Sequence, residues 1–93
     1  MNRTLKPTSQ YKRDLKHFKH DRKLISDLTR VIADLAADVP LAPSFRDHDL
    51  HNNWEGCREC HIRSDTLLIY RKEDKEIHIL ALERFGSHSN LFR

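Results

Sequence analysis

Apolar residues in the first third of the chain recur at the spacing of a helix. Tyr11, Leu15 and Phe18 lie three or four positions apart and form one apolar stripe, and Lys, Arg and His residues surround it. Positions 8 and 9 hold Thr and Ser, which are both good N-caps. The pattern therefore predicts an amphipathic helix over residues 9–19.

A second helix is predicted to follow with almost no linker. Its N-cap is Asp21, and it should end near Asp38, because a residue directly before a proline such as Pro40 avoids helical geometry. Its apolar positions repeat at helical spacing over three turns: Leu24, Ile25, Leu28, Val31, Ile32 and Leu35. We interpret these residues as core, so the two helices form a hairpin that packs on the rest of the chain.

The pattern changes to that of strands beyond a loop predicted over residues 40–53. Aliphatic and β-branched residues predict three strands, over residues 55–62, 66–72 and 76–84. The segments between these strands are short enough for hairpin turns. Residues of the last strand alternate between two faces, with Ile77, Ile79 and Ala81 on one and His78, Leu80 and Leu82 on the other.

These elements together predict an α+β fold. We expect a single domain over residues 1–93, in which the N-terminal helical hairpin packs on an antiparallel sheet of about three to five strands. A short edge strand at Arg3–Lys6, stopped by Pro7, would supply one of them. Because the middle of the sheet is apolar on both faces, the helices should cover one face and leave the other as a binding surface.

Composition and charge exclude several classes of protein. No apolar run approaches the roughly 18 residues that cross a membrane, and the N-terminus has no apolar signal core. We therefore expect a cytoplasmic protein without a membrane partner. Residues 1–30 hold nine Lys and Arg against three Asp and Glu, and the rest of the chain is net acidic. Such a basic segment suits a polyanion partner, and it also fits a solvated helix face.

The two cysteines form a motif that has several interpretations. Residues 57–61 match C-x-x-C-H, the attachment pattern of c-type haem, which also contains half of a zinc site or a redox pair. On a strand, Cys57 and Cys60 would point to opposite faces about 10 Å apart, too far for a disulfide. Zinc would have to recruit His48 or His51, because there is no second C-x-x-C. We therefore expect two reduced structural cysteines and no metal or cofactor, with a metal or haem protein as the minor alternative.

Ionisable residues collect at the predicted strand ends and loops, in a pattern that suits RNA cleavage. RNA carries its own nucleophile, the 2′-OH, so the protein supplies only a base, an acid for the 5′-oxygen and a cation for the phosphorane. Histidine titrates near neutral pH, and arginine binds phosphate oxygens in bidentate fashion. The residues concerned are His48, His51, His61, Asp65, Arg84 and His88.

The same residues also have ordinary structural interpretations. A single histidine on a strand is more often structural than catalytic. Arg84 would pair with Glu83 or Glu59 on the surface. Phe92 or Trp54 would stack a base, but Trp54 is also suited to plugging the core at the entrance of the sheet. Periodicity and residue types alone leave these alternatives open.

Three segments carry a specific combination of motifs. They are Asp47-His48-x-Leu50 with Trp54-x-Gly56-x-Arg58-Glu59-x-His61-Ile62, then Asp65-x-Leu67-Leu68-Ile69-Tyr70-Arg71, and finally Glu83-Arg84-x-Gly86-Ser87-His88-Ser89-x-Leu91-Phe92. Together they closely resemble the YafQ-type toxins of the RelE superfamily over most of the chain. The order of helical hairpin, loop, three strands and C-terminal histidine fits that family. The resemblance implies a RelE-like, microbial-ribonuclease-type fold.

The resemblance also implies the toxin of a bacterial type II toxin–antitoxin system. Such toxins are mRNA interferases, endoribonucleases that enter the vacant A site of the 70S ribosome and cut the codon there. A cognate antitoxin holds them inactive, and the complex binds operator DNA through the antitoxin. The alternative on the same fold is a ParE-like inhibitor of DNA gyrase, which would have no use for acid–base groups.

Carried over residue by residue, the resemblance implies a set of site residues. The implied active site comprises His48, His61, Asp65, Arg84 and His88, with Phe92 beside the bases. In this interpretation His88 is an acid–base residue, and Asp65 or His61 is its counterpart. Arg84 neutralises the scissile phosphate, and His48 positions the RNA backbone. Ribosomal RNA would contact a basic face of Lys12, Arg13, Lys16, Lys19 and Lys23. Thr66 stands where several relatives carry Trp, so one base-stacking group is missing.

Overall fold

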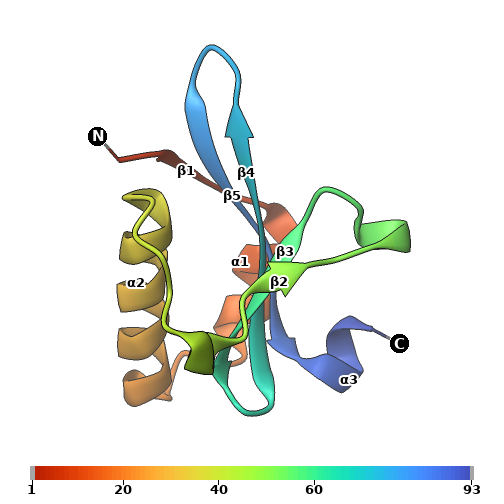
Figure 1. Cartoon of the computed structure of the whole chain (residues 1–93). Helices are drawn as coiled ribbons and strands as arrows, with labels where there is room; N and C mark the ends of the chain where they lie inside the picture. The colour runs from red at the N-terminus through yellow and green to blue at the C-terminus, as the bar shows by residue number, and fades with distance from the viewer. Residues whose placement is uncertain (1, 93) are drawn as a thin grey trace.

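Five strands form one sheet in the order β1-β5-β4-β3-β2 (Figure 1). In the computed structural model, which describes residues 2–92, the strands are β1 (Thr4–Pro7), β2 (His48–Asp49), β3 (Arg58–Arg63), β4 (Thr66–Asp74) and β5 (His78–Ser87). The helices are α1 (Ser9–Lys16), α2 (Arg22–Ala36) and α3 (His88–Leu91), with 3-10 turns at Pro43–Phe45 and Asn52–Trp54. The predicted α+β fold is confirmed.

The sheet is antiparallel except at one edge. From β2 to β5, each strand pairs antiparallel with the next one along the chain, whereas β1 runs parallel to β5. A parallel pair needs a long connection, and here every element from α1 to β4 lies between the two strands. The expectation of a purely antiparallel sheet was therefore wrong for β1.

Helices α1 and α2 form the predicted hairpin on one face of the sheet (Figure 1). The side chains of Thr8 and Asp21 cap them by accepting hydrogen bonds from backbone N–H groups of the first turns. α1 ends at Lys16, earlier than predicted, and a turn over residues 17–20 leads to Asp21. Phe18 lies in this turn and still packs edge-on against Phe85, with ring centroids 5.0 Å apart. None of the described helices is long and apolar enough to cross a membrane.

Apolar residues form a cluster on each face of the sheet. The larger one fills the space between the sheet and the two long helices. The smaller one lies on the other face under α3, a helix that the sequence did not predict. It consists of Cys57, Leu67, Ile69 and Leu91, with Leu50, Trp54 and Phe92 packed against it. The open face of the sheet is therefore only partly covered, and Trp54 belongs to its apolar floor.

A β-bulge in β5 decides which residues face which side. The register between β4 and β5 shifts so that Ile69 pairs with Arg84 and Tyr70 with Leu82, which leaves Glu83 as an extra residue. Strict alternation would put Arg84 on the helix face with Leu82. The bulge places Arg84 on the opposite face instead.

The strand ends also differ from the predictions. Ile77 was predicted inside the third strand, but it lies in the turn before β5 and is 60% exposed. β3 begins at Arg58 rather than at residue 55, because the chain turns at Gly56, which has φ +87. Glycine adopts such a φ without the strain that a side chain would cause. β2 forms within the segment predicted as a loop.

Candidate active site

The sheet register brings several predicted site residues onto the face opposite α1 and α2. His48, Glu59, Ile69 and Arg84 are successive pairing partners across β2, β3, β4 and β5. Paired residues of neighbouring antiparallel strands point to the same face, and each step across the sheet is about 4.8 Å. His61 pairs with Leu67, which pairs with Gly86, and this neighbouring row of residues lies on the same face.

Glu59 is a buried carboxylate between two of the predicted histidines. It is 4% exposed, and its Oε1 lies 3.0 Å from Nε2 of His48 and 3.6 Å from Nε2 of His61. Its Oε2 and the Nδ1 of His61 are buried and have no hydrogen-bond partner among the described residues. Buried polar atoms are nearly always paired, so these two atoms are unusual among the described residues and lie beside two predicted site residues.

A buried tyrosine, Tyr70, binds the residue that directly precedes His48. The Tyr70 hydroxyl donates to Asp47 Oδ1 at 2.6 Å, and Arg58 Nε donates to the same oxygen at 3.2 Å. Burial, together with the hydrogen bond to Asp47, raises the pKa of Tyr70, so its hydroxyl stays a donor. His48 follows Asp47, and its Nδ1 lies 2.6 Å from the carbonyl oxygen of Arg46. The ring is thus bracketed by this carbonyl and by Glu59.

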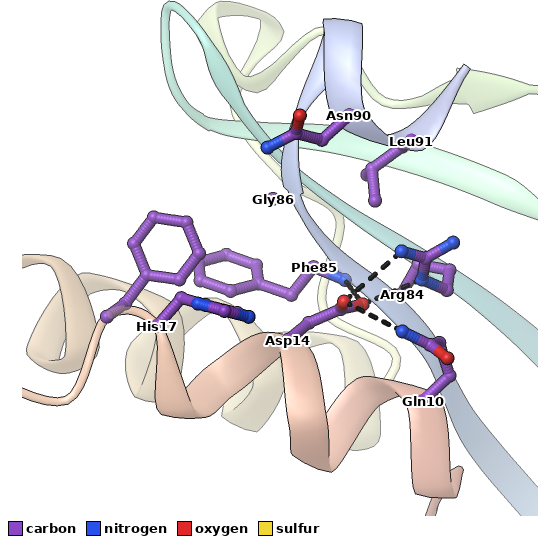
Figure 2. A pocket seen from close by; sticks show the side chains of 9 residues that line it. Gln10, Asp14, His17, Arg84, Phe85, Gly86, Asn90 and Leu91 are labelled. Atoms are coloured by element: carbon purple, nitrogen blue, oxygen red, sulfur yellow. Dashed lines mark hydrogen bonds and ion pairs between the residues drawn. The ribbon is translucent and has the colours of Figure 1, made fainter. Parts of the chain in front are cut away.

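Arg84 is paired with a residue that the sequence analysis did not consider. Its Nε and Nη2 donate to the two carboxylate oxygens of Asp14 on α1, at 2.7 and 3.2 Å (Figure 2). The pair lines a hollow of about 360 Å³ between α1 and α3. The surface pairing with Glu83 or Glu59 considered as an alternative does not occur.

Asp65, His88 and Phe92 lie at one end of the sheet. Asp65 is in the exposed turn between β3 and β4, and its Oδ1 accepts the Thr66 hydroxyl at 3.2 Å. Thr66 pairs with Ser87. Asp65 directly precedes Thr66 and His88 directly follows Ser87, so the β3–β4 turn and the start of α3 lie next to each other. His88 is exposed, and its ring centroid lies 4.7 Å from that of Phe92.

The predicted residues share one face and one end of the sheet rather than one cavity. Arg84 lines the hollow between α1 and α3, whereas His61 lines a different hollow of about 370 Å³ beside Phe45 and Arg46. On the other side of α1, Lys12, Lys16 and Lys19 border a third hollow of about 310 Å³. Arg13 donates to Gln10, and Lys23 pairs with Asp27 on α2.

The cysteines lie on opposite faces of the sheet, as predicted. Cys60 belongs to the cluster under the helices and Cys57 to the cluster under α3, and both thiols are free. Burial raises the pKa of Cys60 to about 12. Within residues 2–92, no group of three or more His, Cys, Asp or Glu side chains is placed to hold a metal ion.

Two acidic residues were missed, and each had a weak signal in the sequence. Glu59 alternates with Cys57 and His61 on the same face of a predicted strand, where a charged side chain facing an apolar sheet has to find a partner. Asp14 lies three positions after Tyr11 and therefore on the apolar stripe of α1. A charge inside a helical apolar stripe indicates a buried ion pair.

Comparison with known proteins gives consistent matches over the whole chain. The family described as a bacterial toxin of the type II toxin–antitoxin system, YafQ, matches residues 3–93. The mRNA interferase toxin YafQ of Escherichia coli (strain K12) is 32% identical in an alignment 93 residues long, which covers 99% of this chain and 98% of that protein. In the crystal structure of the E. coli DinJ–YafQ toxin–antitoxin complex, the matching chain has a TM-score of 0.85 and 32% identity, with 100% of both chains covered. A metal-bound toxin from Helicobacter pylori has a TM-score of 0.87 and 37% identity, with 99% of this chain and 100% of that chain covered.

Proposed function

This chain belongs to the YafQ family of bacterial type II toxin–antitoxin toxins, and we propose that it cuts mRNA in the ribosomal A site. Its relative from E. coli is named an mRNA interferase, that is, an endoribonuclease. The observation that carries the proposal is the arrangement of His48, Glu59 and Arg84 in one row of the open sheet face, with His61 in the next row. Residues suited to acid–base chemistry and to phosphate binding thus occupy neighbouring positions in the strand register, which supports the proposal.

The proposed reaction uses the 2′-OH of the substrate as its nucleophile. A base on the protein takes the proton of the 2′-OH while the 2′-oxygen attacks phosphorus. The P–O bond to the 5′-oxygen breaks, and an acid protonates that oxygen. The products are a 2′,3′-cyclic phosphate and a 5′-OH. We assign His88 to one of the two proton transfers, and Asp65 or His61 to the other.

The remaining site residues bind the RNA. Arg84 stabilises the extra negative charge of the phosphorane through its guanidinium. His48, bracketed by Glu59 and the Arg46 carbonyl, positions the RNA backbone. Phe92, whose ring lies beside that of His88, supports a base.

The proposed contact with ribosomal RNA is the basic surface formed by α1 and the turn that follows it. Lys12, Lys16 and Lys19 are exposed and border one hollow, so their positive charges act on one surface region. Each lysine that binds a phosphate releases a counterion, which makes the affinity sensitive to salt. The protein would thus work in the cytoplasm, on the 70S ribosome and its mRNA.

A cognate antitoxin is the proposed protein partner. The E. coli relative has been solved as a toxin–antitoxin complex with DinJ. We propose that the antitoxin of this chain blocks the open sheet face, and that operator DNA is bound only through the antitoxin.

The experiment is induction of the toxin gene in growing cells, followed by mapping of 5′ ends on a translated transcript. We expect new ends within codons of translated messages and none on the same message without a start codon. His88→Ala should abolish the cuts and leave the fold intact. The matched control is His78→Ala, because His78 is exposed at the far end of β5 and, among the described residues, pairs with Asp74 alone. Growth arrest with DNA damage and uncut mRNA would favour gyrase inhibition instead.

A further inference from the structure

The pair of Arg84 and Asp14 joins the proposed phosphate-binding residue to helix α1. Arg84 is on β5, 70 residues away from Asp14 in sequence, and the two side chains make a two-point contact (Figure 2). Strand β1 ends opposite Leu82, so beyond that point α1 takes its place beside β5. The contact therefore forms where the edge of β5 is left unpaired.

Asp14 is built into the fold as a fixed acceptor. It is 8% exposed, and its Oδ2 also accepts the backbone N–H of Phe85 at 3.0 Å. Its Oδ1 accepts a hydrogen bond from Gln10 Nε2 at 3.2 Å. Burial by itself would raise the pKa of Asp14, but the hydrogen bonds from Arg84, Phe85 and Gln10 outweigh it and keep that pKa below its ordinary value. Asp14 is thus a carboxylate held in place from several sides.

Arg84 keeps one edge of its guanidinium available. Asp14 uses Nε and one proton of Nη2, and these are the Arg84 hydrogen bonds found among residues 2–92. The Arg84 side chain is 24% exposed and borders the hollow of about 360 Å³ that extends to Gly86, Asn90 and Leu91. The edge formed by Nη1 and Nη2 can therefore take two phosphate oxygens while the other edge stays on Asp14.

We propose that Asp14 is a positioning residue for the cleavage reaction, because it holds Arg84 by one edge and presents the other edge to the scissile phosphate. This inference rests on the proposed ribonuclease function. An arginine side chain has four rotatable bonds and loses most of its use as a phosphate clamp when it swings freely. Asp14 removes that freedom without touching the RNA.

The test compares variants in a purified translation system that contains a defined mRNA. Asp14→Asn keeps the shape and one acceptor but removes the charge. We expect the single-turnover cleavage rate to fall by about 10- to 100-fold, as small misplacements of catalytic groups do, with little change in the toxin concentration that gives half-maximal rate. The control is Asp38→Asn, which breaks another carboxylate–arginine pair, with Arg3, at the opposite end of the sheet. It should leave the rate unchanged.

A double-mutant cycle separates positioning from a merely structural role. In an Arg84→Lys background, Asp14→Asn should cost little further activity, because the clamp that Asp14 holds is already gone. An equal loss in both backgrounds, or Asp14→Asn cleavage as fast as or faster than wild type, would overturn the proposal. If Asp14→Asn does not fold, Gln10→Ala takes its place with an expected loss of about 2- to 5-fold, because Gln10 supports Asp14 from the exposed side.

A second readout does not depend on cleavage. The Nε–H of Arg84 should give a slowly exchanging NMR signal in wild type that is lost in Asp14→Asn. If wild type shows this signal but cuts no mRNA, the proposed function fails while the pairing stands. If wild type cuts mRNA and the signal and rate survive in Asp14→Asn, the positioning role fails alone.

Discussion

Removing the hydroxyl of Tyr70 tests whether the fold beneath β2 fixes the position of His48. Tyr70 is 1% exposed, and its hydroxyl donates to Asp47 Oδ1 at 2.6 Å. Asp47 directly precedes His48, whose ring faces Glu59. Tyr70→Phe keeps the aromatic packing and removes the hydroxyl, with its hydrogen bond to Asp47 and its interaction with Arg58. The carboxylate is left with Arg58 as its remaining partner on Oδ1.

The expected loss can be worked out from the type of bond removed. A hydrogen bond to a charged group contributes about 1.5–3 kcal/mol to stability. We therefore expect the free energy of unfolding of Tyr70→Phe to fall by about 2 kcal/mol, because almost no apolar contact is lost with the oxygen. With a urea slope of about 1–2 kcal/mol/M for a small domain, the unfolding midpoint should drop by roughly 1–2 M.

Tyr11→Phe is the matched control for this experiment. Tyr11 is also buried, at 5% exposure, but its hydroxyl has no hydrogen bond to any other described residue. Burial raises the pKa of Tyr11 to about 12, so at pH 7 both tyrosines are protonated and only the hydrogen bond differs. Tyr11→Phe should change the stability by less than about 0.5 kcal/mol. Equal losses in the two variants, or no loss in Tyr70→Phe, would refute the account of the Asp47 contact.

Two further predictions follow from groups with a shifted pKa. Burial raises the pKa of the Cys60 thiol to about 12, so the native thiol should be unreactive. Iodoacetamide at pH 8 should leave Cys60 unmodified in the native protein and label it after unfolding in guanidinium, as mass spectrometry would detect. Rapid labelling of the native protein would contradict the buried position of Cys60. The pKa of Asp14 is lower in the folded than in the unfolded state, so the stability that it contributes is fully present above about pH 4 and lost as the pH falls through the folded-state pKa. Wild type should therefore exceed Asp14→Asn in thermal stability at pH 6–7 and lose that advantage as the pH falls below the folded-state pKa of Asp14, whereas a constant difference would show that the charge of Asp14 plays no part.

The helices and hairpins were predictable because their signals are local. The stripe of Tyr11 and Leu15 places α1, and the caps at Thr8 and Asp21 are side-chain contacts within four residues of the helix start. The turns between the last three strands are likewise short. Such features depend on neighbours in sequence, so the pattern of residues contains them.

The features that the sequence did not predict depend on distant neighbours. The bulge at Glu83 appears only once β5 is laid against β4, because two residues of β5 then oppose one step of β4. β1 pairs with β5 across more than 70 residues, and α3 needs the apolar floor that Leu67 and Ile69 provide. No local pattern encodes these pairings.

In the candidate site too, some residues were predictable from the sequence and others depend on distant neighbours. His48, His61 and Arg84 were named from residue type and from the family resemblance, and the register places all three on one face. Asp14 was not named, and Glu59 was named only as a possible surface partner of Arg84, because the burial and the partners of both residues depend on other elements. A buried carboxylate is recognisable only when the side chains that neutralise it are known.

The position of α1 connects the two proposed contacts with RNA. Its outer face carries Lys12 and Lys16, and its inner face carries Tyr11 and Asp14, as helical spacing requires when the helix lies on the sheet. Asp14 holds Arg84, so the surface that would meet ribosomal RNA and the residue that would meet the scissile phosphate are only one helix diameter apart. If cleavage depends on the ribosome, no separate mobile element would be needed to link the two contacts, because the helix proposed to dock also carries the residue proposed to position Arg84.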